Sequence, residues 1–193
     1  MALALVTSLF LVILLWVTWQ YCRRRDPLLR DVMWMFSSVA MLFVVSMVRL
    51  LVGAPPRLVT TLAIGLLLAK PLFTLRLVSR LRPLRSWWWP VAVTAWAMSV
   101  FPVLATTTRP APRPAIWSAV IVFFVIEAIA AGLLGVEARR RGGAARARLW
   151  CAAAGTGLFG AALLVSAAGL ALSARVLAVV SGVLYLLAFV PPR

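Results

Sequence analysis

The chain contains no histidine, only four acidic residues and only two cysteines among its 193 residues. Without histidine it cannot form a Ser-His-Asp triad, a histidine-ligated haem, a histidine-containing metal site or a phospho-accepting histidine. Two cysteines provide neither a zinc site nor a disulfide framework, and four carboxylates are too few for a metal cage or an acid–base pair. We therefore predict that the chain is not an enzyme, and we expect no catalytic residue, no metal site and no cofactor.

Charged residues are also scarce, at 12%, whereas hydrophobic residues make up 64% and the mean hydropathy is +1.04. Soluble globular proteins contain roughly 25% charged and roughly 45–50% apolar residues. The apolar residues form long runs, several of them close to the about 20 residues that a helix needs to cross a bilayer. The period-two alternation of barrel strands is absent. We predict an all-α, polytopic transmembrane helix bundle that forms a single domain over residues 1–193.

Seven apolar runs are expected to be membrane spans, because each approaches the length of a transmembrane helix. Segments rich in arginine, proline or glycine separate most of them. The weakest boundary is the short polar link at 172–175, between the sixth and seventh runs. The expected spans are approximately residues 1–20, 32–52, 58–75, 87–105, 115–136, 149–170 and 176–190.

The basic residues are distributed unevenly between the links, and this asymmetry predicts the orientation in the membrane. Links rich in lysine and arginine face the cytoplasm. We therefore predict an N-terminus outside, a C-terminus inside, and a multi-pass protein of the cell (plasma) membrane. The first, third and fifth links carry Arg23, Arg24, Arg25, Arg30, Arg76, Arg80, Arg82, Arg85, Arg139, Arg140, Arg141, Arg146 and Arg148, whereas the second, fourth and sixth carry Arg57, Arg109, Arg113 and Arg175.

The formal net charge of +16 is explained by the same pattern. Each basic cluster lies directly beside a hydrophobic run, where it sets the topology and attracts anionic lipid headgroups. We expect the lipid bilayer and these headgroups to be the partners of the chain, and we expect no nucleic acid partner.

Three ionisable residues fall within the expected spans, and such residues are functional-site candidates because intramembrane charge is costly. Arg49 lies near an outer end and is expected to extend its side chain to the surface. Lys70 and Glu127 each lie about 12 residues, or about 18 Å, from the expected outer end of their spans. A shared depth allows them to form an intramembrane charge pair. In the alternative interpretation, Lys70 reaches toward Arg76 and the surface while Glu127 is protonated.

Pro71 follows Lys70 directly and is expected to kink its helix. The proline removes one backbone donor and clashes with the carbonyl of Leu67. A kink beside a buried charge would suit a moving part of a sensor or transporter. Prolines are also common in membrane helices without any such role, so ordinary helix packing explains Pro71 equally well.

Small residues recur at four-residue spacing in the sixth span and again in the seventh. Such stripes allow two helix backbones to approach closely. The partner of the sixth span is expected to be the seventh, although a second subunit in a homodimer is the alternative. The residues concerned are Ala153, Gly157 and Ala161 in the sixth span, and Ala178 and Gly182 in the seventh.

The last nine residues read Tyr185-Leu186-Leu187-Ala188-Phe189-Val190-Pro191-Pro192-Arg193. This segment resembles the exits of multi-span input regions in bacterial sensor proteins, where it leads into GAF, histidine-kinase or diguanylate-cyclase modules. The arginine-rich inner links and short outer links are similar to the same regions. The resemblance implies a sensory input region of the bacterial inner membrane, whose output module is absent or lies on another chain.

Two functions remain open on this basis. The leading hypothesis is a sensory input or scaffold module in signal transduction, which relays a membrane-embedded stimulus through its last helix to a cytoplasmic signalling module. The alternative is a small transporter or proton-coupled carrier with Lys70 and Glu127 at a midplane site. A lipid-acting enzyme is disfavoured, because histidines are absent and acidic residues are few.

Overall fold

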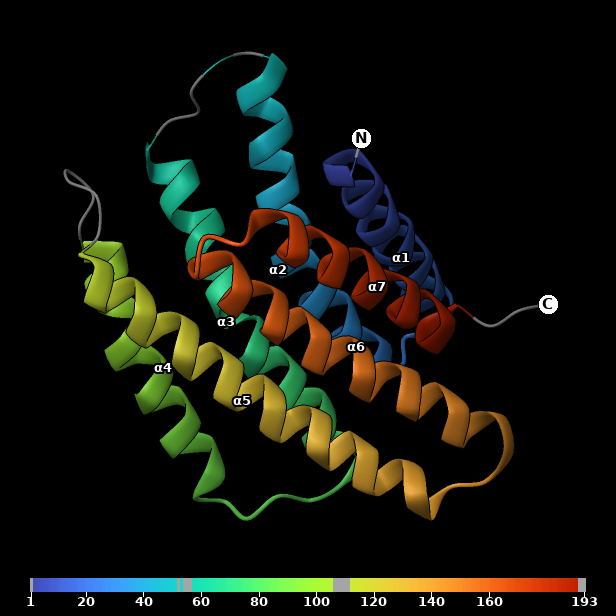
Figure 1. The fold of residues 1–193 in the computed structure, drawn as a ribbon. Helices are drawn as coiled ribbons and strands as arrows, with labels where there is room; N and C mark the ends of the chain where they lie inside the picture. Colours follow the sequence, from blue (N-terminus) through green and yellow to red (C-terminus); the bar gives the residue numbers. More distant parts are fainter. Residues whose placement is uncertain (1, 52, 54–56, 106–111, 191–193) are drawn as a thin grey trace.

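The structure is a computed structural model that describes residues 2–51, 53, 57–105 and 112–190. Within these residues the chain is all-α and forms seven helices (Figure 1). Arg109 and the exit residues Pro191, Pro192 and Arg193 lie outside the described residues. The helices are α1 (Ala2–Arg24), α2 (Pro27–Leu51), α3 (Arg57–Leu81), α4 (Trp88–Ala105), α5 (Arg113–Arg140), α6 (Gly143–Ala167) and α7 (Ala171–Phe189).

Five helices of the described chain, α3 to α7, are long and apolar enough to cross a membrane. The chain is therefore a helical protein with several candidate membrane spans, in contact with a lipid bilayer. For α1 and α2, and for the orientation of the bundle, the membrane assignment stays a prediction.

Six of the helices form a closed circuit of contacts. α1 contacts α2 and α7, α2 contacts α3, α3 contacts α5, α5 contacts α6, and α6 contacts α7. α4 lies outside this circuit, against α3 and α5, at the edge of the bundle in Figure 1. It is the least buried of the five candidate spans.

The core of the bundle is rich in aromatic side chains. The ring of Phe10 contacts those of Phe36, Phe159 and Tyr185 at centroid distances of 6.1, 5.7 and 6.3 Å, all tilted or edge-on. Edge-to-face and tilted pairs are the favoured geometry for aromatic rings, and they add to the energy of burial. Each helix of the circuit contributes to this core, with Phe10 on α1, Phe36 on α2, Leu68 on α3, Phe123 on α5, Phe159 on α6 and Tyr185 on α7.

The helices extend beyond the expected spans for local reasons. α2 begins at Pro27, where proline is well tolerated, and the carboxylate of Asp26 accepts a hydrogen bond of 2.8 Å from the main-chain nitrogen of Leu28. α3 continues past Leu75 to Leu81, so Arg76 and Arg80 belong to the helix rather than to a link.

The link between α6 and α7 lies earlier than the sequence prediction placed it. Gly169 adopts a φ of 85°, and Leu170 donates its main-chain N–H to the carbonyl of Val165 at 3.1 Å. Gly169 in turn donates to Ser166 at 3.0 Å. These two bonds and the left-handed glycine form a Schellman motif, which ends α6. Residues 172–175, expected to be the link, are therefore the first turns of α7.

Candidate functional site: a buried polar network across four helices

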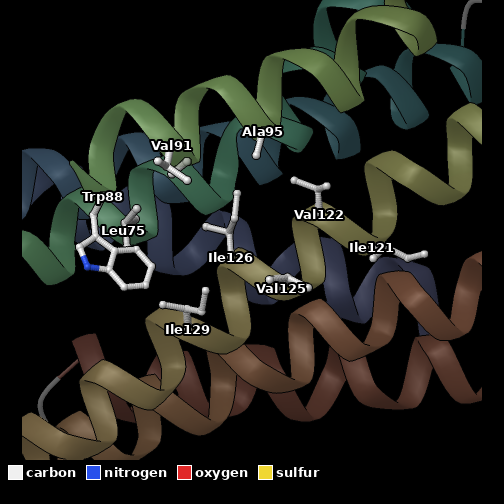
Figure 2. Close-up of a pocket in the computed structure, with 10 residues that line it drawn as sticks. Leu75, Trp88, Val91, Ala95, Ile121, Val122, Val125, Ile126 and Ile129 are labelled. Atoms are coloured by element: carbon white, nitrogen blue, oxygen red, sulfur yellow. The ribbon is translucent and has the colours of Figure 1, made fainter.

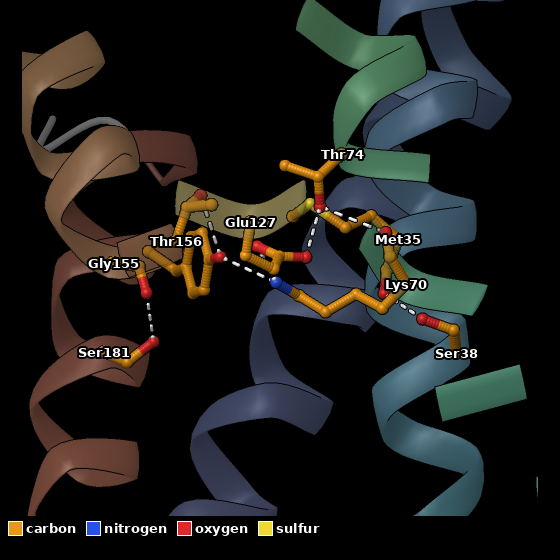
Figure 3. Close-up of polar contacts among 9 residues, drawn as sticks. Met35, Ser38, Lys70, Thr74, Glu127, Gly155, Thr156 and Ser181 are labelled. Atoms are coloured by element: carbon orange, nitrogen blue, oxygen red, sulfur yellow. Dashed lines mark hydrogen bonds and ion pairs between the residues drawn. The ribbon is translucent and has the colours of Figure 1, made fainter. Parts of the chain in front are cut away.

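The structure brings Lys70 and Glu127 together inside the bundle. Lys70 lies near the midpoint of α3 and Glu127 near the midpoint of α5. Nζ of Lys70 lies 2.9 Å from Oε2 of Glu127, and both side chains are 0% exposed (Figure 3). At this separation and burial the two groups form a charge-assisted hydrogen bond in a medium of low dielectric constant.

The Lys70 ammonium group has two hydrogen-bond partners and an aromatic neighbour. It donates to Glu127 and, at 3.1 Å, to Oη of Tyr185 on α7. It also lies 4.4 Å from the centroid of the Phe159 ring on α6, a cation–π distance. A buried lysine without partners would carry a large desolvation cost, and these three contacts offset it.

Two threonines extend the network. Oγ1 of Thr74 lies 3.1 Å from Oε1 of Glu127 and 3.1 Å from the main-chain oxygen of Lys70, one turn earlier on α3. Oη of Tyr185 donates to Oγ1 of Thr156 on α6 at 3.0 Å. The network thus joins α3, α5, α6 and α7 through side chains that are all at most 1% exposed.

The network leaves none of its polar atoms without a partner. Among the residues that the structure describes, Nε1 of Trp16 on α1 is the buried side-chain atom that lacks one, and it belongs to no part of the network. A fully satisfied buried network specifies a single arrangement of the helices that carry it, whereas a half-satisfied one is strongly unfavourable.

Glycines of α6 allow its neighbours to approach the network closely. A methyl group on Gly155 would lie 3.3 Å from Cδ1 of Tyr185, and one on Gly160 would lie 3.2 Å from Cβ of Glu127. The hydroxyl of Ser181 on α7 donates to the carbonyl of Gly155 at 2.7 Å (Figure 3). α6 therefore contacts α7 at Gly155 and α5 at Gly160.

The small residues at four-residue spacing in the sixth and seventh spans do not all lie at the contact between α6 and α7. Gly157 faces α5, where a methyl group would lie 3.8 Å from Cβ of Ala131, and Gly182 faces Leu9 and Phe10 of α1 rather than α6. The nearest neighbours of Gly182 therefore belong to α1, while α6 and α7 contact each other as expected, for example at Gly155 and Ser181. Ala153 is buried in a small cluster with Ala130 and Ala188, Ala161 is half-buried, and Ala178 packs at the edge of the aromatic core.

Pro71 is buried within an unbroken α3, directly after Lys70. Next to it, the indole nitrogen of Trp96 on α4 donates to the main-chain oxygen of Leu68 at 2.8 Å. Proline removes the donor that would reach Leu67, so this stretch of α3 has a weakened backbone ladder. The hydrogen bond from Trp96 attaches α4 to α3 at this position.

The expected kink at Pro71 stays a prediction. The expected extension of the Arg49 side chain to the surface also stays a prediction, because that side chain lies outside the described residues.

An apolar groove of about 190 Å³ runs between α4 and α5 (Figure 2). Trp88 lies at one end and Ile121 toward the other, and all the lining side chains are hydrophobic. Such a surface suits hydrocarbon and has no polar group that would orient a substrate. It does not reach the buried network, because neither Lys70 nor Glu127 lines it.

Tyr185, Thr74 and Thr156 were not singled out as site residues from the sequence. One signal was available for Thr74, which is four residues from Lys70 and therefore on the same helix face. Tyr185 and Thr156 had no such signal, since their proximity to Lys70 depends on how α6 and α7 pack against α3.

In the described part of the chain, no group of three or more histidine, cysteine, aspartate or glutamate residues is placed to hold a metal ion.

No protein-family model, curated protein or solved structure matches the chain. Over its described residues, the chain is a helical protein with five candidate membrane spans and a buried polar network whose side-chain atoms all have hydrogen-bond partners.

Proposed function

We propose that the chain is a membrane-embedded input or scaffold module in bacterial signal transduction. In this proposal seven spans place the N-terminus outside and the C-terminus in the cytoplasm. The observation that carries the proposal is the hydrogen bond of 3.1 Å between Lys70 and Tyr185, because it ties the buried ion pair to α7, the last helix. A stimulus that alters the network would move the helix that leads into the cytoplasm.

The contacts of α7 support this role. Tyr185 joins α7 to α3 and α6, and its ring meets Phe36 of α2 edge-on at 5.2 Å. Gly182 allows a close approach of α1. The position of α7 therefore depends on four other helices, and a rearrangement in any of them acts on it.

The energetics of the network favour two discrete states over a gradual response. Separating Lys70 from Glu127 strands two charges in a low-dielectric interior, which costs several kcal/mol, about 3–5 in soluble proteins. Intermediate arrangements are disfavoured for this reason, and packed cores respond by switching between arrangements. A ligand or lipid that binds the two arrangements differently would shift their populations.

A small transporter or proton-coupled carrier is the second candidate, and the midpoint position of the buried pair is the observation that favours it. Both side chains are fully buried in this conformation, so an ion or substrate would reach them only after the helices separate. This function predicts flux that depends on Glu127.

Spin labels on α5 and α7 test whether the network controls the last helix. In a Cys22→Ser, Cys151→Ala background, labels at the exposed positions Val136 and Leu187 report the α5–α7 distance by pulsed electron resonance in nanodiscs. We expect Glu127→Gln and Tyr185→Phe to shift or broaden the distance distribution. Glu137→Gln is the matched control, because Glu137 bonds to Arg141 and lies outside the network.

Unchanged distances in both network variants would overturn the signalling proposal. Proton or cation flux in liposomes, lost in Glu127→Gln and retained in Glu137→Gln, would establish the carrier in its place.

A further inference from the structure

A second buried carboxylate lies in the first turns of α2. The side chain of Asp31 is 1% exposed, and its two oxygens contact arginines from two helices. Oδ2 accepts a hydrogen bond of 3.1 Å from Nε of Arg80, and Oδ1 lies 3.3 Å from Nε of Arg76 and 3.9 Å from Nε of Arg30. Asp31 thus holds three guanidinium groups together where the start of α2 meets the end of α3.

The cluster keeps a net positive charge and an excess of hydrogen-bond donors. One carboxylate faces three guanidinium groups, each of which carries five donors. Arg76 and Arg80 contact Asp31 through Nε, the nitrogen nearest the side-chain stem, and their side chains remain 45% and 41% exposed. The outer parts of both groups are therefore accessible for a second, anionic partner.

Aromatic side chains lie one turn deeper along the same two helices. Trp34 of α2 stacks on Phe73 of α3, with ring centroids 6.3 Å apart and planes 20° from parallel. Trp34 is 49% exposed. Tryptophan is enriched where hydrocarbon meets headgroups, and arginine is enriched just outside that level. The order from the helix ends inward, arginines and then an exposed aromatic stack, matches the order of headgroup and acyl chain in a phospholipid.

We infer that Arg76 and Arg80, positioned by Asp31, bind the headgroup phosphate of an anionic phospholipid, whose acyl chains lie along Trp34 and Phe73. Guanidinium groups recognise phosphate through paired N–H donors in a planar fork, and two of them held by one carboxylate form a prepared receptor. The inference goes beyond the signalling proposal, because it requires only that these ends of α2 and α3 reach a membrane surface.

Lipid retention by the purified full chain tests this site. The chain is released from mixed micelles of equimolar phosphatidylglycerol and phosphatidylcholine, and native mass spectrometry measures the ratio of the two lipids retained. The variant is Arg76→Lys with Arg80→Lys, which keeps both charges and the ability to pair with Asp31 but removes the planar fork. We expect the phosphatidylglycerol preference to fall about tenfold, as when charge-assisted hydrogen bonds are lost.

The matched control is Arg146→Lys with Arg148→Lys, which makes the same exchange at exposed positions of α6. It should keep the wild-type preference. An unchanged preference in Arg76→Lys with Arg80→Lys would show that bulk charge alone attracts the lipid and would overturn the site. Circular dichroism checks that both variants are folded. Displacement of phosphatidylglycerol by inorganic phosphate at equal concentration would also overturn the inference, because the site would then bind a free anion.

Discussion

At the scale of single residues, Lys70 holds the largest number of strong interactions in the buried network. It contacts a carboxylate, a phenol oxygen and an aromatic face that come from three different helices. Because all of these groups are excluded from water, the loss of any one leaves the others without compensation. The network therefore behaves as a unit, and its members cannot be assigned independent energies.

A double-mutant cycle on the pair measures this coupling. Glu127→Gln and Lys70→Met should each destabilise the bundle by several kcal/mol, about 3–5 by analogy with soluble proteins, because each change strands a buried charge. The double change should recover much of the loss, since replacing both members of a buried pair is often neutral. Unfolding free energies in detergent give the coupling energy. Additive losses would show that the two residues do not act as partners.

The sequence predicts the two charged residues of this site, but it does not predict the hydroxyl-bearing residues that complete it. Lys70 and Glu127 stood out because ionisable residues are rare in apolar runs, and their similar depth suggested a pair. Tyr185 and Thr156 did not stand out, because hydroxyl groups occur in membrane helices for ordinary packing reasons. Their role depends on helix order around the bundle, and no spacing along the chain encodes it.

At the scale of elements, α6 is the helix whose surface shape matters most, because it contacts α5 and α7 on adjacent faces. The close contacts are at Gly155 and Gly160, whereas Gly157 has more space. The four-residue stripe of the sequence runs through Ala153, Gly157 and Ala161 and includes neither of the two glycines with close contacts. It could not distinguish which glycine meets a fixed atom, because that depends on the rotation of α6 against its neighbours.

Two alanine substitutions on α6 test this difference. In Gly160→Ala the new methyl group would lie 3.2 Å from Cβ of Glu127, which is fixed to the α5 backbone and cannot move aside. We expect a destabilisation of about 1–3 kcal/mol from overpacking. Gly157→Ala, with its nearest contact at 3.8 Å, should be neutral or stabilising, because alanine favours the helix. Thermal unfolding in detergent measures both, and equal effects would contradict the assigned facing of α6.

At the scale of the whole molecule, the closed circuit of six helices places the first helix beside the last, since α7 contacts α1. Apolar runs and arginine-rich links were enough to predict an all-α molecule with several spans. The circuit itself and the outer position of α4 were beyond sequence reasoning, because helices that are apolar on every side give no preference for one neighbour over another.

Reporter fusions test the predicted orientation of the molecule. The arginine-rich links should face the cytoplasm, because positive charge near short loops sets the topology of membrane proteins. Alkaline phosphatase, active outside, and green fluorescent protein, fluorescent inside, provide complementary readouts. An inverted pattern at any two positions would contradict both the topology and the signalling proposal. Fusions after Pro56, Arg113 and Arg175 should report the outside, and those after Arg30, Arg85 and Arg146 the cytoplasm.

The separation of the network residues along the chain has a consequence for biosynthesis. Lys70 emerges from the ribosome 57 residues before Glu127 and 115 residues before Tyr185. At about 5–20 residues per second, the nascent α3 exists for several seconds without its counter-ion. A lysine at the centre of an isolated helix disfavours insertion by about 2.5–3.5 kcal/mol. We therefore expect α3 to become more stable in the bilayer once α5 supplies the counter-ion, and the network to be completed when synthesis of α7 delivers the tyrosine.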